Sequence, residues 1–144
     1  MTPTQRNARK PDMDLDNPVI RLCLEGTQAE FERRLDDARR LYRQAWEIAT
    51  DDYDACIAAH YVARHQANPE ETLRWNQIAL ERAEADHADR ADRSDRADQY
   101  DRVGEFFPSL YLALGRAHEV LGHQAEAQQS YDRAAELGVI HRAD

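Results

Sequence analysis

The sequence predicts an all-α protein built from helix pairs, and three observations lead to that prediction. Proline and glycine residues divide the chain into segments of helical length. Within those segments, apolar residues recur three and four positions apart, a spacing that places them on one face of a helix. No segment of the sequence alternates apolar and polar residues in the way that a half-buried strand does.

Boundary signals mark the first three expected helices. Asn17 followed by Pro18 is typical of a cap and a first-turn proline, and it opens a helix that runs to Phe31. A second helix, over residues 35–48, carries one broad apolar stripe. The third, over residues 53–66, is apolar on nearly every side, so we expect it to be the most buried helix.

Similar signals mark the other three helices. Asn68, followed by proline and two glutamates, caps a fourth helix that passes through Ala83. Pro108 begins a fifth helix that ends near Gly122. The sixth runs from about 124 to 137, and Gly138 is expected to stop it. The domain organisation predicted from these helices is a disordered tail over 1–16, a helical domain over 17–140 and a short tail over 141–144.

Composition limits what this domain does. The chain of 144 residues is long enough for one domain with a modest core. Its formal net charge of −9 argues against nucleic-acid binding, which uses basic surfaces. No apolar run is long enough to cross a membrane, and Met1 to Asn17 lacks the apolar centre of a signal peptide. We therefore expect a cytoplasmic protein that binds neither nucleic acid nor membrane.

A charged insertion separates the fourth helix from the fifth, over about residues 86–104. Aspartate occupies every third position from Asp86 to Asp101, and a three-residue repeat builds no apolar face on a helix, so this run is not expected in the core. Asp86 and Arg90 begin a series of acid-before-base pairs at a spacing of four, which favours a helix. Either the fourth helix continues for two or three turns past Ala85, or the run is disordered.

Histidines and cysteines are the candidates for metal or redox chemistry. His118 and His123 are five residues apart, whereas zinc-hydrolase helices use a spacing of four, and five helical residues separate two side chains by about 140°. We therefore predict that these histidines face different ways and hold no metal. Cys23 and Cys56 lie at apolar positions with helical spacing, so they are predicted to be reduced, buried side chains. No cofactor is expected.

The helix pairs show an internal repeat. Between residues 111 and 134 the sequence contains Tyr111-x2-Leu114-Gly115-x2-His118, then Ala127-x3-Tyr131 and Ala134. This pattern resembles the tetratricopeptide motif, and the same frame recurs at Gly26 and Tyr42 and again, about 34 residues later, at His60 and Asn76. The resemblance, to small bacterial proteins of this family, covers about residues 17–138. It implies three helix pairs in a short curved array that binds a protein or peptide without catalysing a reaction.

In arrays of this kind, the first helix of each pair lines the concave groove. By that frame the candidate binding residues are Thr27, Tyr61, Arg64, His65, Arg116 and Glu119. No lysine occurs within the array, so the carboxylate clamp of chaperone-binding tetratricopeptide domains is not matched. We expect Arg64 and Arg116 to bind an acidic or C-terminal peptide group through bidentate hydrogen bonds. The alternative is that both arginines are solvated surface.

Two positions depart from the repeat pattern. His60 replaces the expected glycine, and Asn76 replaces the expected aromatic residue. One interpretation is that His60 is buried and hydrogen-bonded within the scaffold. The other is a polar pocket between the first and second repeats, to which Glu25 and Trp75 also contribute. The sequence places no nucleophile beside a base and contains no metal-ligand cluster, so we do not expect an enzyme.

Self-association is the alternative to partner binding. A nearly continuous apolar run opens the first helix, and one neighbouring helix is not expected to cover it: Val19, Ile20, Leu22, Cys23 and Leu24. Exposed apolar patches usually mark interfaces, so the run predicts a two-fold homodimer through the N-terminal helix pair. A structural assembly unit and a peptide- or small-ligand-sensing module are the corresponding alternative functions.

Overall fold

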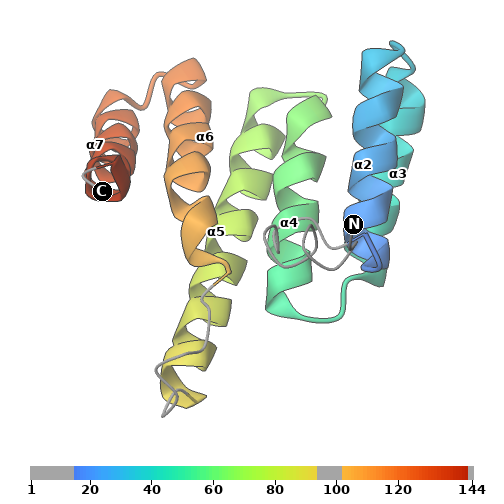
Figure 1. The fold of residues 1–144 in the computed structure, drawn as a ribbon. Helices are drawn as coiled ribbons and strands as arrows, with labels where there is room; N and C mark the ends of the chain where they lie inside the picture. The colour runs from blue at the N-terminus through green and yellow to red at the C-terminus, as the bar shows by residue number, and fades with distance from the viewer. Residues whose placement is uncertain (1–14, 94–101, 143–144) are drawn as a thin grey trace.

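The computed structural model describes residues 15–93 and 102–142, and throughout these ranges it contains helices and connecting turns but no strand. Within these ranges six α-helices follow one another (Figure 1): α2 (Pro18–Phe31), α3 (Leu35–Ile48), α4 (Asp52–Val62), α5 (Pro69–Arg93), α6 (Phe107–Val120) and α7 (Gln124–Arg142). Two short 3-10 turns, η1 (Ala63–His65) and η2 (Gly104–Phe106), extend α4 and precede α6. The all-α prediction is confirmed.

The helices are arranged as three consecutive pairs, α2–α3, α4–α5 and α6–α7. The second pair packs on the first because α4 contacts both α2 and α3, while the third pair packs on the second mainly through contacts between α6 and α5. Figure 1 shows the result as a row, with the first pair at one edge and α7 at the other. The prediction of three helix pairs is also confirmed.

Side-chain caps from Asn17, Asp51 and Asn68 fix the starts of α2, α4 and α5. The Asn17 side chain accepts a hydrogen bond from the backbone N–H of Val19 at 2.8 Å, directly before Pro18. Asn68 accepts one from Glu71 at 2.8 Å, as the sequence predicts. Each cap satisfies a backbone donor that the helix itself leaves without a partner.

The core is centred on α4, which is the most buried helix, as predicted. Small residues on this helix, including Ala58 and Ala59, are fully buried and allow close approach of its neighbours. Next to α4, Trp46 and Trp75 pack edge to face with their ring centres 5.1 Å apart. Aromatic side chains therefore fill the space between the first and second pairs.

Both cysteines are free thiols in this core. Cys23 and Cys56 are each only 1% exposed, and neither forms a disulfide. Burial raises the pKa of each thiol to about 12, and nearby carboxylates, Asp54 for Cys23 and Asp86 for Cys56, add to the shift. Both thiols are therefore protonated and unreactive at neutral pH.

The charged insertion is helical in its first part. Helix α5 continues past Ala85 to Arg93, which confirms the helical alternative up to that residue, and residues 94–101 lie outside the described part of the chain. The expectation that the aspartate run is not core is wrong at Asp86, which is only 9% exposed and accepts a hydrogen bond from Arg90 at 3.2 Å. Just after the run, Val103 is fully buried where the chain rejoins the array.

The last helix is longer than predicted. Gly138 was expected to end it, but α7 continues to Arg142, so part of the predicted tail over 141–144 is helical. Glycine ends a helix when the backbone adopts a positive φ, and in the described residues Gly122 is the only glycine that does so. At Gly138 the backbone stays helical, and glycine at this position only lowers the stability of the helix modestly relative to alanine.

The turn between α6 and α7 corrects a second expectation. The helix ends near Gly122 as expected, but the prediction that His118 and His123 face different ways took the angle between them from helical spacing, whereas α6 ends at Val120 and Gly122 takes a φ of 81°. The chain therefore turns back on itself. The two imidazole rings meet, and their Nδ1 atoms lie 3.0 Å apart.

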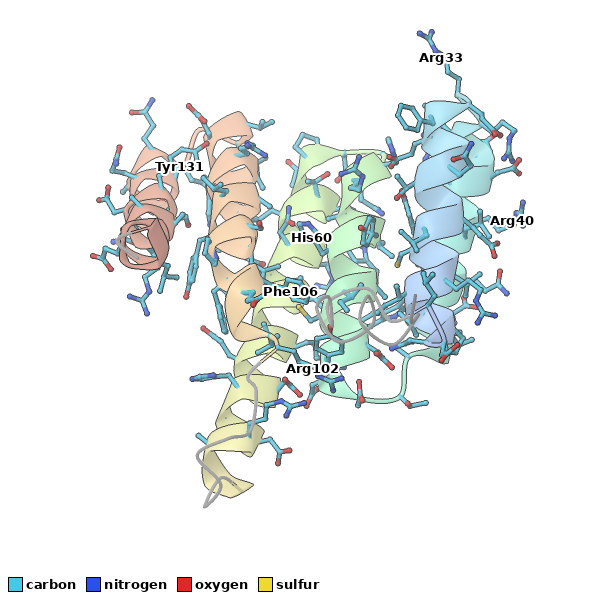
Figure 2. The ribbon with its side chains drawn as sticks, in the orientation of Figure 1. Arg33, Arg40, His60, Arg102, Phe106 and Tyr131 are labelled. Atoms are coloured by element: carbon cyan, nitrogen blue, oxygen red, sulfur yellow. The ribbon has the colours of Figure 1, made fainter. Side chains whose placement is uncertain are left out.

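The turn between α2 and α3 has the same geometry without a glycine. Arg33 takes a φ of 64° there, and Figure 2 shows its side chain projecting beyond the end of the first pair. A left-handed backbone costs a non-glycine residue roughly 1–2 kcal/mol. Arg33 thus occupies the position that Gly122 holds in the third pair.

We expect Arg33→Gly to stabilise the protein. Relief of the left-handed strain exceeds the added flexibility of glycine in the unfolded chain, so the free energy of unfolding should rise by about 0.5–1 kcal/mol. Urea denaturation measures the change. As a matched control, Arg40→Gly in the exposed middle of α3 should lower that free energy by about 1 kcal/mol. A loss of stability in Arg33→Gly would contradict the strain argument.

Three of the five residues in the apolar run at the start of α2 are buried within their own chain. Val19, Ile20 and Cys23 are each at most 5% exposed, because α3 and α4 both pack on this helix. The assumption that a single helix neighbours the run is wrong, since two neighbours are present. Leu22 and Leu24 are only half-buried, whereas Val19, Ile20 and Cys23 offer no exposed surface to a partner, and the homodimer stays a prediction. Within the described residues, no helix is long and apolar enough to span a membrane.

Candidate functional site: a cavity between the second and third helix pairs

The first and third helix pairs are held together by the same three residue types. In the first pair, a Cβ atom on Gly26 would lie 2.3 Å from the ring of Tyr42, so only glycine lets that ring approach. The third pair repeats this contact between Gly115 and Tyr131 at 2.6 Å. Each tyrosine interacts with a glutamate of the facing helix, Glu30 in the first pair and Glu119 in the third.

The second pair replaces all three residue types at once. Thirty-four positions after Gly26, Glu30 and Tyr42, the chain has His60, Arg64 and Asn76. The large side chain thus moves to α4, and α5 carries a smaller one. Asn76 is 5% exposed, and its amide donates to the carbonyl oxygen of Thr72 at 3.0 Å, one turn earlier in its own helix.

A cavity of about 750 Å³ opens where this replacement occurs. It lies between the second and third pairs and is lined by residues of α4, η1, α5, α6 and the loop before α5. Its main polar residues are His60, Arg64, Gln66, Asn68, Thr72, Asn76, Ser109 and Arg116, and its larger apolar ones are Leu112 and Val120.

The junction between the first and second pairs is filled more completely. There the Tyr42 ring packs against Tyr61, with ring centres 5.2 Å apart. The cavity beside Tyr42 measures about 420 Å³, little more than half of the one beside Asn76. We attribute the larger cavity to the missing aromatic ring, because protein interiors close-pack wherever side chains are large enough to meet.

Arg64 is already engaged by the first pair. Its Nε and one terminal nitrogen donate to the two carboxylate oxygens of Glu30 at 2.9 and 2.8 Å, and His65 Nε2 lies 2.5 Å from the same carboxylate. Burial alone would raise the pKa of Glu30, but hydrogen bonds from Arg64, Tyr42 and His65 outweigh it and lower that pKa to about 2. Arg64 was expected to bind a carboxylate of a ligand through two hydrogen bonds, but it makes both of them to Glu30.

Arg116 differs from Arg64 in this respect. It lies on α6 at the cavity, its side chain is exposed, and it makes no hydrogen bond or ion pair with any residue that the structure describes. An arginine in this position presents its full set of donors to a bound group. Of the two arginines in the predicted groove, Arg116 is therefore the one available to a ligand.

His60 is the other unusual group in the cavity wall. Its Nδ1 is buried and has no hydrogen-bond partner among the described residues, so the interpretation that the scaffold satisfies this histidine fails at that atom. Burial and the charge of Arg64 both lower its pKa, which keeps the ring neutral. Buried polar atoms without partners are rare in folded proteins, so this Nδ1 is a candidate to bond a group that enters the cavity.

No protein-family model, no curated protein and no solved structure matches this chain.

The other predicted groove residues are spread over all three pairs, with Tyr61 on α4 and His65 in η1. Thr27 donates to the Cys23 carbonyl oxygen at 3.0 Å and lies 3.4 Å from the Tyr42 hydroxyl. Glu119 accepts a hydrogen bond from Tyr131 at 2.6 Å. These residues, together with Tyr61 and His65, support packing between helices and do not line the larger cavity.

The predicted polar pocket is only partly assembled. His60 and Asn76 do lie together, but the cavity that they line is between the second and third pairs rather than between the first and second. Glu25 is exposed on α2, and Trp75 is packed in the core beneath Arg43. Neither residue reaches the cavity.

Sequence reasoning missed the apolar part of the cavity wall. Leu112 and Val120 flank Arg116 at spacings of four, which forms a stripe along α6. Leu112 is 39% exposed and Val120 is 70% exposed, so no helix of the described array covers this stripe. The spacing was visible in the sequence, but which stripe of α6 faces a neighbour depends on how the pairs stack.

Proposed function

We propose that this chain is a non-catalytic, tetratricopeptide-like scaffold that binds a protein or peptide segment in the cavity between the second and third helix pairs. The observation that carries the proposal is the position of Arg116, which has no ion pair among the described residues and lines the cavity. We attribute this cavity to Asn76, which stands where the other two pairs have tyrosine. The chemical group that this arrangement fits is a carboxylate, either an acidic side chain or a C-terminus.

The composition of the wall supports a peptide ligand. A guanidinium group donates two parallel hydrogen bonds to a carboxylate. In the same cavity wall, His60 has a buried Nδ1 that lacks a partner among the described residues, and the Asn76 amide uses a single hydrogen bond there. Leu112 and Val120 add exposed apolar surface for a neighbouring side chain. The volume lies within the range of about 300–1,000 Å³ that is common for ligand pockets.

The net charge of the chain shapes the expected binding. At −9 the protein repels an acidic ligand at long range, so the attraction depends on the short-range contact with Arg116. Salt screens the long-range repulsion over about 10 Å at 0.1 M, whereas it weakens a close, partly desolvated pair much less. Moderate salt should therefore leave binding intact.

The experiment selects short random peptides with free carboxyl ends against the full chain and measures their affinities by fluorescence anisotropy. We expect Arg116→Ala to weaken the selected peptides by about tenfold or more, because a charge-assisted bidentate contact is lost. Amidating or neutralising the peptide's essential carboxylate should have the same effect. The control is Arg40→Ala, on the exposed face of α3 and paired with Asp37, which should not change the affinity.

Two results would contradict the proposal. One is an unchanged affinity in Arg116→Ala while Arg40→Ala also binds normally, since the ligand would then lie elsewhere. The other is selection of peptides whose binding does not depend on any carboxylate.

A further inference from the structure

The turn between α6 and α7 brings two imidazoles together through its backbone. Gly122 N–H donates to the carbonyl oxygen of Glu119 at 3.0 Å, and His123 N–H donates to that of His118 at 2.9 Å. These two bonds and the positive φ of Gly122 define a Schellman motif, in which the side chains at the positions of His118 and His123 normally make an apolar contact. Here that contact is between two histidine rings.

The corresponding turn of the first pair shows what is unusual. There the same backbone bonds form around Arg33, and the equivalent side chains are Ala29 and Arg34. The motif therefore does not itself require histidine at either position. Two imidazoles are a feature of the third pair rather than of the repeat.

The distance between the rings suits a shared ligand. His118 Nδ1 and His123 Nδ1 are 3.0 Å apart, with ring centres separated by 5.3 Å and planes tilted by 49°. In the metal-free pair, one Nδ1–H donates to the other Nδ1. Two imidazole nitrogens bound to one ion at about 2.0–2.1 Å are separated by roughly 2.9–3.3 Å for bond angles between square and tetrahedral. The observed separation falls within that span.

We propose that His118 and His123 form a two-histidine site for a divalent transition-metal ion of the zinc, copper and nickel class. Imidazole is a preferred ligand for these ions. No group of three or more possible metal ligands converges in the described part of the chain, so water completes the coordination shell. The ion takes the place of the shared proton and joins the last turn of α6 to the residue that precedes α7.

The surroundings support binding of a cation. The carboxylate of Glu126, in the first turn of α7, interacts electrostatically with the His118 ring and contributes negative charge near it. The His118 and His123 rings lie at the surface, so each can turn a nitrogen lone pair toward an ion.

Titration calorimetry with Zn²⁺, at a pH of about 7.5 where imidazole is neutral, tests the site on the full chain. We expect one Zn²⁺ per chain, and a loss of affinity of at least about tenfold in either His118→Asn or His123→Asn. His118→Phe restores an apolar contact in the turn, so it keeps the fold while removing the ligand. Zn²⁺ should raise the melting temperature of the unmodified chain and leave that of His118→Phe unchanged.

His87→Asn and His141→Asn are the matched controls. His87 lies on the exposed side of α5, and His141 is close to the end of α7. Both variants should bind Zn²⁺ like the unmodified chain. The proposal is overturned if Zn²⁺ does not bind at millimolar concentration, if binding survives both single substitutions in the turn, or if it disappears in either control.

Discussion

Gly26→Ala should lower the free energy of unfolding by about 3 kcal/mol. The added Cβ would lie 2.3 Å from a ring atom of Tyr42, closer than side-chain atoms approach one another. Tyr42 is 1% exposed and packs against Tyr61, so its ring moves away from Gly26 only by giving up that contact. Overpacking of this kind typically costs 1–3 kcal/mol, and we expect the upper end where the ring is this deeply buried. Urea denaturation followed by circular dichroism measures the effect.

The other glycines provide graded controls for this prediction. Gly115→Ala meets Tyr131 at 2.6 Å, but Tyr131 is only half-buried at the edge of the array, so its ring is able to shift and the loss should be smaller. In Gly138→Ala no atom lies within 4 Å of the added Cβ, so alanine should stabilise α7 by about 0.5–1 kcal/mol. The packing argument is wrong if all three variants change stability equally.

Glu30→Gln should lower the free energy of unfolding by about 2 kcal/mol at pH 7. The substitution keeps the shape of the side chain but removes the charge that Arg64 and His65 contact. A pKa lowered from 4.5 to about 2 corresponds in full to about 3 kcal/mol. Arg64 is 49% exposed, and solvent screening reduces the expected loss.

The pH dependence identifies the charge as the cause. Because the pKa of Glu30 is lower in the folded state than in the unfolded state, its contribution is complete above about pH 4.5 and is lost as the pH falls toward 2. The stability difference between the unmodified chain and Glu30→Gln should shrink across that window. Glu32→Gln, on the exposed end of the same helix, should have a smaller effect at every pH. A difference that does not change with pH would contradict the argument.

Sequence patterns predicted the helices well and the contacts between helices less well. The starts of α2 and α5 followed from Asn17 and Asn68, since a cap depends on residues a few positions away. The end of α7 did not follow from Gly138, because glycine stops a helix only where the backbone takes a positive φ. The meeting of His118 and His123 was missed for a related reason, since helical spacing does not apply across a turn.

Some residues of the candidate site were predicted, but not its place in the fold. His60 and Asn76 were recognised as departures from a repeat, which is a property of sequence alone. That Arg64 turns to Glu30 while Arg116 stays unpaired within the described residues depends on the stacking of three helix pairs. No local pattern contains that information, because the interacting residues lie thirty or more positions apart.

The way in which the third pair is attached has a consequence for its dynamics. The main contacts of α6 and α7 with the rest of the array run through α5, whereas α4 is held by α2, α3 and α5 together. A unit joined along one side opens more readily than one joined along several, so α6 and α7 should behave as a separate cooperative unit that detaches before the remainder unfolds. The cavity lies on this joint, with walls on both sides of it. A ligand that contacts both walls of the cavity would bind only while α6 and α7 are attached, so a higher ligand concentration would shift the equilibrium away from the detached state. Binding would therefore make this end of the molecule more rigid.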